Sequence, residues 1–219
     1  MKRYEVGGGR YLSVSDEMKG KMLGIVSINT SPSMNEMCLR NRKIVGSICA
    51  SCYSFQKEAW LPSCRGAWQE NGRVLSERVL RDKDIPIFNY RVIRVNAQGD
   101  FINGIHYRNI VKIVEANPAS IFSIFTKNLR VIRGVGLVKL DNLVYVYSAL
   151  MKDVERVVKP NGFSKTFSVY TRKYIREHKG IELNCAGRSC FRCMVCYSHN
   201  GISRVNELVK WSGDSIKED

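Results

Sequence analysis

The clearest folding unit of the chain is residues 121–148, which read IFSIFTKNLRVIRGVGLVKLDNLVYVYS. Two short apolar runs, Ile121–Thr126 and Leu143–Ser148, are rich in aromatic and β-branched residues, as buried strands are. Between them, residues from Asn128 to about Val135 have the pattern of a short helix. A strand, a helix and a second strand in this order predict a parallel βαβ unit.

The same alternation extends in both directions from this unit. Further strands are expected at Leu23–Ile28, Ile87–Val95 and Phe167–Tyr170, and further helices at Trp68–Leu80, Ile105–Ala116, Met151–Val158 and Arg172–His178. Repeated βα units predict the α/β class, either as a partial (β/α) barrel or as an open, mostly parallel sheet. In both architectures the functional residues gather at the carboxyl ends of the strands, where both cysteine-rich ends of this chain could meet.

One domain over residues 1–219 is the natural reading, because no low-complexity or proline-rich linker interrupts the chain. Within it we distinguish an N-terminal cysteine segment (21–64), the β/α units (65–180) and a C-terminal cysteine segment (181–219). The start of the chain lacks a signal peptide pattern, and no apolar run approaches the ~20 residues that span a bilayer. We therefore expect a cytoplasmic protein without a membrane partner.

Eight cysteines fall into two groups of four near the ends of the sequence: Cys38, Cys49, Cys52, Cys64, Cys185, Cys190, Cys193 and Cys196. Each group contains the same motif, C-x2-C-Y-S, at residues 49–54 and 193–198. A C-x2-C turn places two sulfurs at the separation that one metal ion or iron–sulfur cluster needs. Disulfide frameworks belong to small secreted chains, so metal ligation by cysteine is the favoured prediction.

The metal itself is open between iron and zinc. The second group reads C-x4-C-x2-C-x2-C, close to the runs that hold 4Fe–4S clusters, whereas the first group is more widely spaced. One or two 4Fe–4S clusters are favoured over structural zinc, which remains the alternative. The role of Cys64 distinguishes two kinds of first site. If Cys64 is a ligand, the site is closed and structural. If it is not a ligand, the site keeps an open position. His199 could replace a cysteine ligand, or it could lie at the surface.

Polar residues follow several predicted strands. Asp100 comes after the strand that ends near Val95, Lys127 follows Thr126, and Ser148 ends the next strand, so these three are candidate catalytic residues lining one pocket. Gly99 and Asp100 are candidate cofactor-binding residues. Asp100 could alternatively cap the helix that starts near Gly104.

The chain is strongly basic, with 35 Lys and Arg against 20 Asp and Glu, a net charge of +15. Two 4Fe–4S clusters with thiolate ligands, each near −2, would leave roughly +11 (15 − 4). The surplus predicts sequence-tolerant binding to nucleic acid, or else a solvated basic surface. The residues that could form a basic rim are Arg91, Arg94, Arg130, Arg133, Lys152, Arg156, Arg172 and Lys173.

Several motifs together resemble a phage family known as gene product 88-like, over about Lys21 to Glu207. They are Ser27-Ile28-Asn29-Thr30-Ser31, Cys38, Ile48-Cys49-Ala50-Ser51-Cys52-Tyr53, Arg94-Val95-Asn96, Gly99-Asp100-Phe101, Asn117-Pro118, Thr126-Lys127 and the closing cysteine run. This resemblance implies a phage protein in the host cytoplasm, and the family has no settled function to carry over.

More distantly, Cys49-x2-Cys52-Tyr53 after a first strand is similar to radical S-adenosylmethionine proteins. The similarity implies a cluster on Cys38, Cys49 and Cys52, with Gly99-Asp100 where those proteins hold the amino group of S-adenosylmethionine. Ten residues separate Cys38 from Cys49 here, instead of the usual three.

Two functions follow as hypotheses. The first is a phage-encoded iron–sulfur protein on a radical-SAM-like scaffold that binds or acts on nucleic acid. The second is a non-catalytic module in which zinc or iron–sulfur sites hold the chain ends and the surface binds nucleic acid or a host protein.

Overall fold

A computed structural model describes residues 1–16, 18–185 and 187–209 of the chain. Its frame is one open, mixed sheet of eight strands, whose spatial order β1-β2-β3-β4-β5-β6-β7-β8 is also the chain order. The strands are β1 (Lys2–Glu5), β2 (Tyr11–Ser15), β3 (Val26–Ile28), β4 (Val92–Val95), β5 (Ile121–Thr126), β6 (Leu143–Ser148), β7 (Lys165–Tyr170) and β8 (Arg204–Leu208). β1, β2 and β3 pair antiparallel, and every pair from β3 to β8 is parallel. The α/β class and the mostly parallel open sheet are therefore confirmed.

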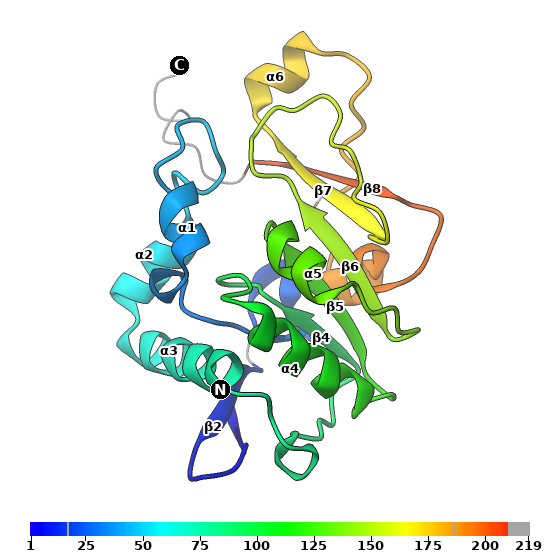
Figure 1. Ribbon diagram of the computed structural model, residues 1–219. Helices are drawn as coiled ribbons and strands as arrows, with labels where there is room; N and C mark the ends of the chain where they lie inside the picture. The colour runs from blue at the N-terminus through cyan, green and yellow to red at the C-terminus, as the bar shows by residue number, and fades with distance from the viewer. Residues whose placement is uncertain (17, 186, 210–219) are drawn as a thin grey trace.

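Helices lie in the connections between the parallel strands, except between β6 and β7 (Figure 1). They are α1 (Glu36–Asn41), α2 (Tyr53–Trp60), α3 (Pro62–Glu77), α4 (Gly104–Glu115), α5 (Leu129–Val135), α6 (Arg172–Glu177) and α7 (Cys190–Cys193), with 3-10 turns η1 (Gly20–Met22), η2 (Pro32–Met34), η3 (Asp82–Asp84) and η4 (Val195–Tyr197). In the described chain, none of these helices is long and apolar enough to cross a membrane.

The larger core lies between one face of the sheet and helices α3, α4 and α5. Ile93 and Ile124 point from the strands into this core, and Leu75 and Ile110 meet them from the helices, all fully buried. Alternate strand residues point to opposite faces, which is why every second position of β4 and β5 joins this core. Burial of this apolar surface is the main stabilising contribution to the fold.

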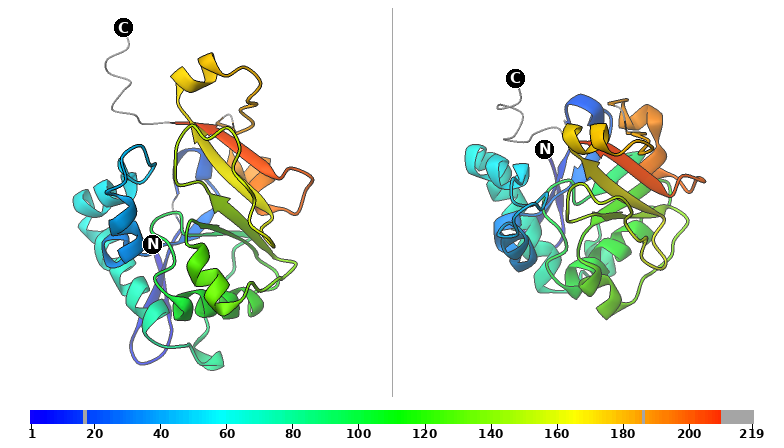
Figure 2. Two further views of the ribbon diagram at one scale, coloured as in Figure 1. Left: turned by 45° about the horizontal axis from the view of Figure 1, so that its top comes forward. Right: turned by 90° about the horizontal axis from the view of Figure 1, so that it is seen from above.

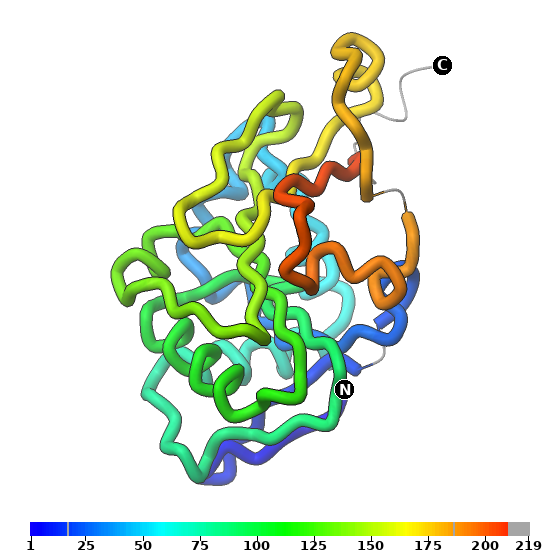
Figure 3. The backbone as a smooth tube through the Cα atoms, turned by 90° about the vertical axis from the view of Figure 1, so that its right-hand side faces the viewer, coloured from blue at the N-terminus to red at the C-terminus, as the bar shows by residue number. Residues whose placement is uncertain are grey.

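The opposite face of the sheet is covered by the C-terminal cysteine segment. Val144 and Val146 of β6 pack with Phe125 there, next to Cys196. Seen from above, α7 and the helices α4 and α5 lie on opposite sides of the sheet (Figure 2). α7 also lies beside η1, so that segments far apart in sequence meet (Figure 3).

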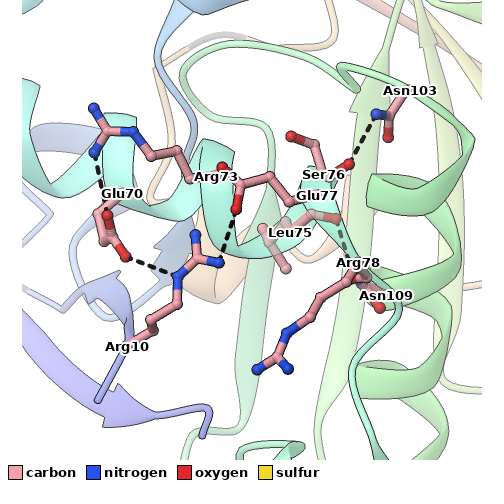
Figure 4. A network of polar contacts seen from close by, with 9 residues as sticks. All are labelled: Arg10, Glu70, Arg73, Leu75, Ser76, Glu77, Arg78, Asn103 and Asn109. Carbon is pink, nitrogen blue, oxygen red and sulfur yellow. Dashed lines mark hydrogen bonds and ion pairs between the residues drawn. The ribbon is translucent and has the colours of Figure 1, made fainter. Parts of the chain in front are cut away.

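Polar contacts join the N-terminal hairpin and α4 to α3 (Figure 4). Arg10 Nη1 lies 2.8 Å from Glu77 Oε2, and Asn109 Nδ2 donates to the carbonyl oxygens of Leu75 and Arg78, at 2.8 Å each. The buried Asn109 amide thus satisfies carbonyls at the end of α3 that have no partner within that helix.

Several predicted elements differ from the structure. The strand expected from Leu23 begins at Val26, and the helix expected from Trp68 begins at Pro62. The strand expected from Ile87 begins only at Val92, because Asn117 Oδ1 accepts the backbone N–H of Phe88 at 2.6 Å and so occupies a group a strand would use. No helix forms over residues 151–158. Asp153 there has φ +59°, and its carboxylate accepts from Thr171 N at 2.6 Å, which ties this loop to the end of β7.

Candidate metal and cofactor site

The loops after β3 and β4 hold each other at the carboxyl edge of the sheet. Asn29 Oδ1 accepts from Gln98 N at 2.9 Å, and Thr30 N donates to Gln98 O at 3.3 Å. Gly99 has φ +72°, and any side chain at this position would collide with the carbonyl oxygen of Thr30. Glycine is therefore required where these two loops cross.

Asn35 positions the first cysteine against the loop after β4. Its Oδ1 accepts from Met37 N and Cys38 N, at 3.0 and 3.3 Å, and so caps α1. Its Nδ2 donates to the carbonyl oxygens of Asp100 and Phe101, at 2.9 Å each. One buried amide therefore holds the Cys38 turn beside Asp100.

The C-x2-C turn at residues 49–52 is held at both of its ends. Ile48 N donates to Leu150 O at 2.9 Å, so the turn is fixed to the loop that follows β6. Cys52 N donates to Cys49 O at 3.2 Å and closes the turn, after which Tyr53 begins α2. The Tyr53 hydroxyl donates to Ala97 O at 2.8 Å, which anchors the motif to the end of β4.

Three cysteines share one electrostatic environment at this edge. Burial raises the pKa of the Cys38 thiol, and the nearby Asp100, Cys49 and Cys52 raise it further. Burial also raises the pKa of Cys49, while the cation of Lys127 opposes the shift at both thiols. Cys38, Cys49, Cys52, Asp100 and Lys127 thus lie close enough to act on one another.

Asp100 is buried, and both of its carboxylate oxygens are occupied. Oδ1 accepts from Phe101 N at 2.7 Å and from Thr126 Oγ1 at 2.6 Å, and Oδ2 accepts from Lys127 N at 2.8 Å. Asp100 therefore joins the ends of β4 and β5. The alternative that it caps the following helix is wrong, because Asn103 caps α4 by accepting from His106 N.

Lys127 and Ser148 also lie at this edge. Lys127 follows β5, Ser148 ends β6, and Lys127 Nζ donates to Ser148 Oγ at 2.8 Å. This bond directs the lysine along the strand ends, where its charge reaches Cys38 and Cys49. The structure therefore brings Asp100, Lys127 and Ser148 together with the first cysteines.

Buried polar atoms without partners lie in the same loop. Asn96 is 5 % exposed and has φ +60°, and neither its Oδ1 nor its Nδ2 has a hydrogen-bond partner. Gln98 is 4 % exposed, and its Oε1 is also unpaired. Unpaired buried groups cost free energy, and they are typical of places where a ligand completes the bonding. An open cleft of about 560 Å³ borders Cys52, with Arg42 and Phe55 among its lining residues.

The comparisons with known proteins identify a family. The family profile described as Gene product 88 matches residues 10–194, which is most of the chain. The chain belongs to this phage protein family. The match includes the whole first cysteine group and the strand-end residues, and it ends before Cys196.

No curated protein and no solved structure matches the chain. The more distant similarity to radical S-adenosylmethionine proteins therefore depends on the residues of this chain alone. The family resemblance expected from the motifs is confirmed.

Cys64 stands apart from the other cysteines of the first group. It lies in the first turn of α3, whereas Cys38 and the Cys49–Cys52 turn precede α2. It is not among the groups that shift the pKa of Cys38 or Cys49.

Among the residues that the structure describes, no three His, Cys, Asp or Glu side chains stand at metal-binding separation. All eight cysteines are thiols outside any disulfide.

The second cysteine group lies on the face of the sheet opposite α4 and α5, where Cys190 and Cys196 pack in a cluster with Val92 and Ala97. The expectation that both groups meet at the carboxyl edge stays a prediction. Cys196 packs against Val144 and Val146, in the middle of β6. His199 is exposed in the loop that follows η4.

Arg94 was expected on a basic rim, and this is a further correction. Its side chain points from β4 towards the face of the sheet opposite α4 and α5. The guanidinium carbon lies 3.7 Å from the centroid of the Phe125 ring. Sequence reasoning did not anticipate this inward direction, nor the roles of Asn35 and Asn96. Alternation along β4 was the available signal, since Ile93 and Val95 occupy the helix-covered face and leave Arg94 on the other.

Proposed function

We propose that this protein is an iron–sulfur protein with one open cluster, held by Cys38, Cys49 and Cys52 at the carboxyl edge of the sheet. The observation that carries the proposal is the grouping of these three thiols with Lys127 at the ends of parallel strands. Ligands and cofactors of open α/β sheets bind at this edge.

The donor set fits a cluster with three protein ligands. Thiolates are the ligands of iron–sulfur clusters, and a neighbouring cation favours the thiolate form. Lys127 supplies that cation, and Ser148 orients it. Cys64, in α3, is outside the set, so one iron of a 4Fe–4S cluster would stay open for a small ligand.

S-adenosylmethionine is the small ligand that we propose for this open position. The support is the polar loop after β4, in which the Asn96 amide and Gln98 Oε1 are buried without partners. Such a loop offers donors and acceptors to a charged, polar molecule. Asp100 holds the loop in place through its three hydrogen bonds, which engage both of its carboxylate oxygens.

Anaerobic purification tests the proposal. Wild-type protein should be brown and contain iron and acid-labile sulfide, and Cys38→Ser, Cys49→Ser or Cys52→Ser should each remove about four irons per chain. Adding S-adenosylmethionine to the reduced protein should change the electron paramagnetic resonance spectrum of the cluster. Asn96→Ala should weaken that change without removing iron.

Cys64→Ser is the matched control, since it makes the same chemical change one helix away. It should leave both the iron content and the spectrum as in the wild type. A colourless, folded wild-type protein with stoichiometric zinc, or equal iron loss in the Cys64→Ser protein, would refute the proposal.

A second candidate function is nucleic-acid binding by a metal-tethered, non-catalytic module. The observation that favours it is the exposure of Arg130 and Arg133 on α5 and of Arg172 and Lys173 on α6. These helices follow β5 and β7, so their cations stand near one edge of the sheet. The two functions are compatible if nucleic acid is the substrate.

A further inference from the structure

Two cations lie beside the C-terminal cysteines, on the face of the sheet opposite α4 and α5. Lys21 Nζ lies 3.5 Å from Cys185 Sγ and also forms an ion pair with Glu207. Cys190 packs with the apolar cluster around Val92, and Cys196 packs over β6. The segment is fixed to the sheet, because Ser123 Oγ of β5 donates to Cys196 O at 2.7 Å.

Arg94 is the second cation at this position, and it is short of partners. Its Nε is buried without a hydrogen bond, its Nη1 lies 3.6 Å from Met22 Sδ, and the uncharged Tyr197 side chain lies beside it. Within the described chain no carboxylate lies within ion-pair distance of Arg94. Stacking on Phe125 offsets only part of the hydration free energy that a guanidinium loses on burial, because such contacts contribute about 2 kcal/mol at best.

Two tyrosines and two thiols act on the Arg94 charge. Burial opposes its charge, whereas Tyr197, Tyr53, Cys196 and Cys190 raise the pKa of Arg94. Cys196 packs in one cluster with Phe125, and Cys190 packs in another with Met22, so both thiols adjoin side chains that Arg94 contacts. The missing counter-charge of Arg94 would therefore be supplied by thiolates at Cys190 and Cys196.

Thiolates become stable in such a setting when they bind a metal. A Zn²⁺ ion with four thiolates carries about −2 (2 − 4), and a 4Fe–4S²⁺ core with four thiolates carries the same charge. Each bound thiolate has released one proton to solvent. A dianionic centre would supply the counter-charge that Arg94 lacks and would add to the one that Lys21 already has in Glu207.

We infer that Cys185, Cys190, Cys193 and Cys196 form a metal–thiolate site whose built-in counter-ions are Arg94 and Lys21. The site lies on the face of the sheet opposite α4 and α5. It is independent of the proposed cluster at Cys38, Cys49 and Cys52, since the two sites share no ligand. Cys193 is the exposed member and borders an open cleft that Arg188 and Arg192 also line, which gives the metal an entry path.

A variant without the first site isolates the second one. We would replace Cys38, Cys49 and Cys52 together by Ser, produce the full chain in iron- and in zinc-supplemented medium, and measure metal and sulfide. About one zinc, or about four irons with four sulfides, should remain per chain, and either result supports a dianionic tetrathiolate centre. A folded triple variant without bound metal would overturn the inference, whatever the result for the open cluster.

The counter-ion role is tested in the same background. Arg94→Gln should speed the loss of metal to a chelator at least tenfold, and Arg94→Lys should restore part of the resistance because it keeps the charge. Arg130→Gln, on the exposed surface of α5, is the charge-matched control and should change nothing. If Arg94→Gln fails to fold, Lys21→Gln tests the other cation, and it should also speed the loss of metal to the chelator. Unchanged chelator resistance in folded Arg94→Gln or Lys21→Gln protein contradicts the inference.

Discussion

Buried polar side chains do most of the positioning at the candidate site. Asn29, Asn35 and Asp100 each bond to backbone groups of a neighbouring loop, so that three strand ends share one network. A buried carboxylate with several hydrogen bonds is costly to disturb, because each lost partner leaves an unpaired group. Asp100 is therefore best described as a positioning residue for the loops that carry Cys38 and Lys127.

His106 is one residue whose charge state makes stability depend on pH. It is fully buried in α4, its Nδ1 accepts from Ile102 N at 3.2 Å, and burial lowers its pKa to about 3. The unfolded chain takes up a proton near pH 6.5 and the folded chain does not, so stability is lost as pH falls below 6.5. Between pH 6 and 5 the wild type should lose about 1 kcal/mol more than His106→Gln. Urea unfolding of both proteins at several pH values checks this, and parallel pH profiles would contradict it.

Elements of the fold were predictable where local pattern and tertiary environment agree. β5 and β6 have the predicted bounds because their apolar runs are buried on both faces of the sheet. β1 and β8 were missed since their residues are mostly polar and they lie at the edges of the sheet. The expected helix at residues 151–158 failed because Asp153 bonds to the end of β7, a long-range contact that local pattern does not contain.

The candidate site was predictable in its residue types but not in its grouping. The C-x2-C motifs and the polar strand ends are visible in the sequence, and the first motif does lie beside Asp100 and Lys127. Which cysteines stand together depends on how α1 and α2 fold back over the edge of the sheet. That arrangement depends on Asn35 and Tyr53, whose bonds cross about 65 and 44 residues of sequence.

The C-terminal cysteine segment is the element whose stability should depend on metal. Its residues 190–197 form only one short helix and one 3-10 turn, so metal binding would supply much of the folding free energy of this part. Cys196→Ser should lower the free energy of unfolding of metal-loaded protein by roughly 2 kcal/mol or more. Cys64→Ser, in the first turn of α3, should lower it by less than about 0.5 kcal/mol. Thermal and urea unfolding compare the two, and equal stability of both variants would count against a metal in this segment.

At the scale of the whole molecule, one sheet separates two cysteine groups. The first lies on the carboxyl edge between α1 and α2, and the second covers the face opposite α4 and α5. Both C-x2-C-Y-S motifs nevertheless approach β4, because Tyr53 and Tyr197 both lie near Arg94. Tyr197 packs in a cluster with Val92 and Ala97, and the Tyr53 hydroxyl donates to Ala97 O, so the tyrosines of both motifs meet the end of β4.

The exposed cations of α5 and α6 predict salt-sensitive binding of nucleic acid by the whole molecule. Phosphate contacts release counterions, so affinity for a short oligonucleotide should fall at least tenfold between about 50 and 200 mM salt, with little dependence on sequence. The double variant Arg172→Gln/Lys173→Gln should weaken binding and reduce the salt slope by up to about 2. Fluorescence anisotropy with single- and double-stranded oligonucleotides measures both quantities.

The matched control removes two exposed cations from the other end of the parallel strands. Lys83 precedes β4 and Lys139 precedes β6, so Lys83→Gln/Lys139→Gln makes the same change in net charge near the amino ends. If nucleic acid binds along the carboxyl edge, this control should keep most of the wild-type affinity and slope, since contacts beyond a Debye length of about 8 Å are screened. Equal weakening by both double variants would instead indicate a diffuse effect of net charge. Absence of binding even at low salt would leave the basic surface as a solvated one and favour a protein partner.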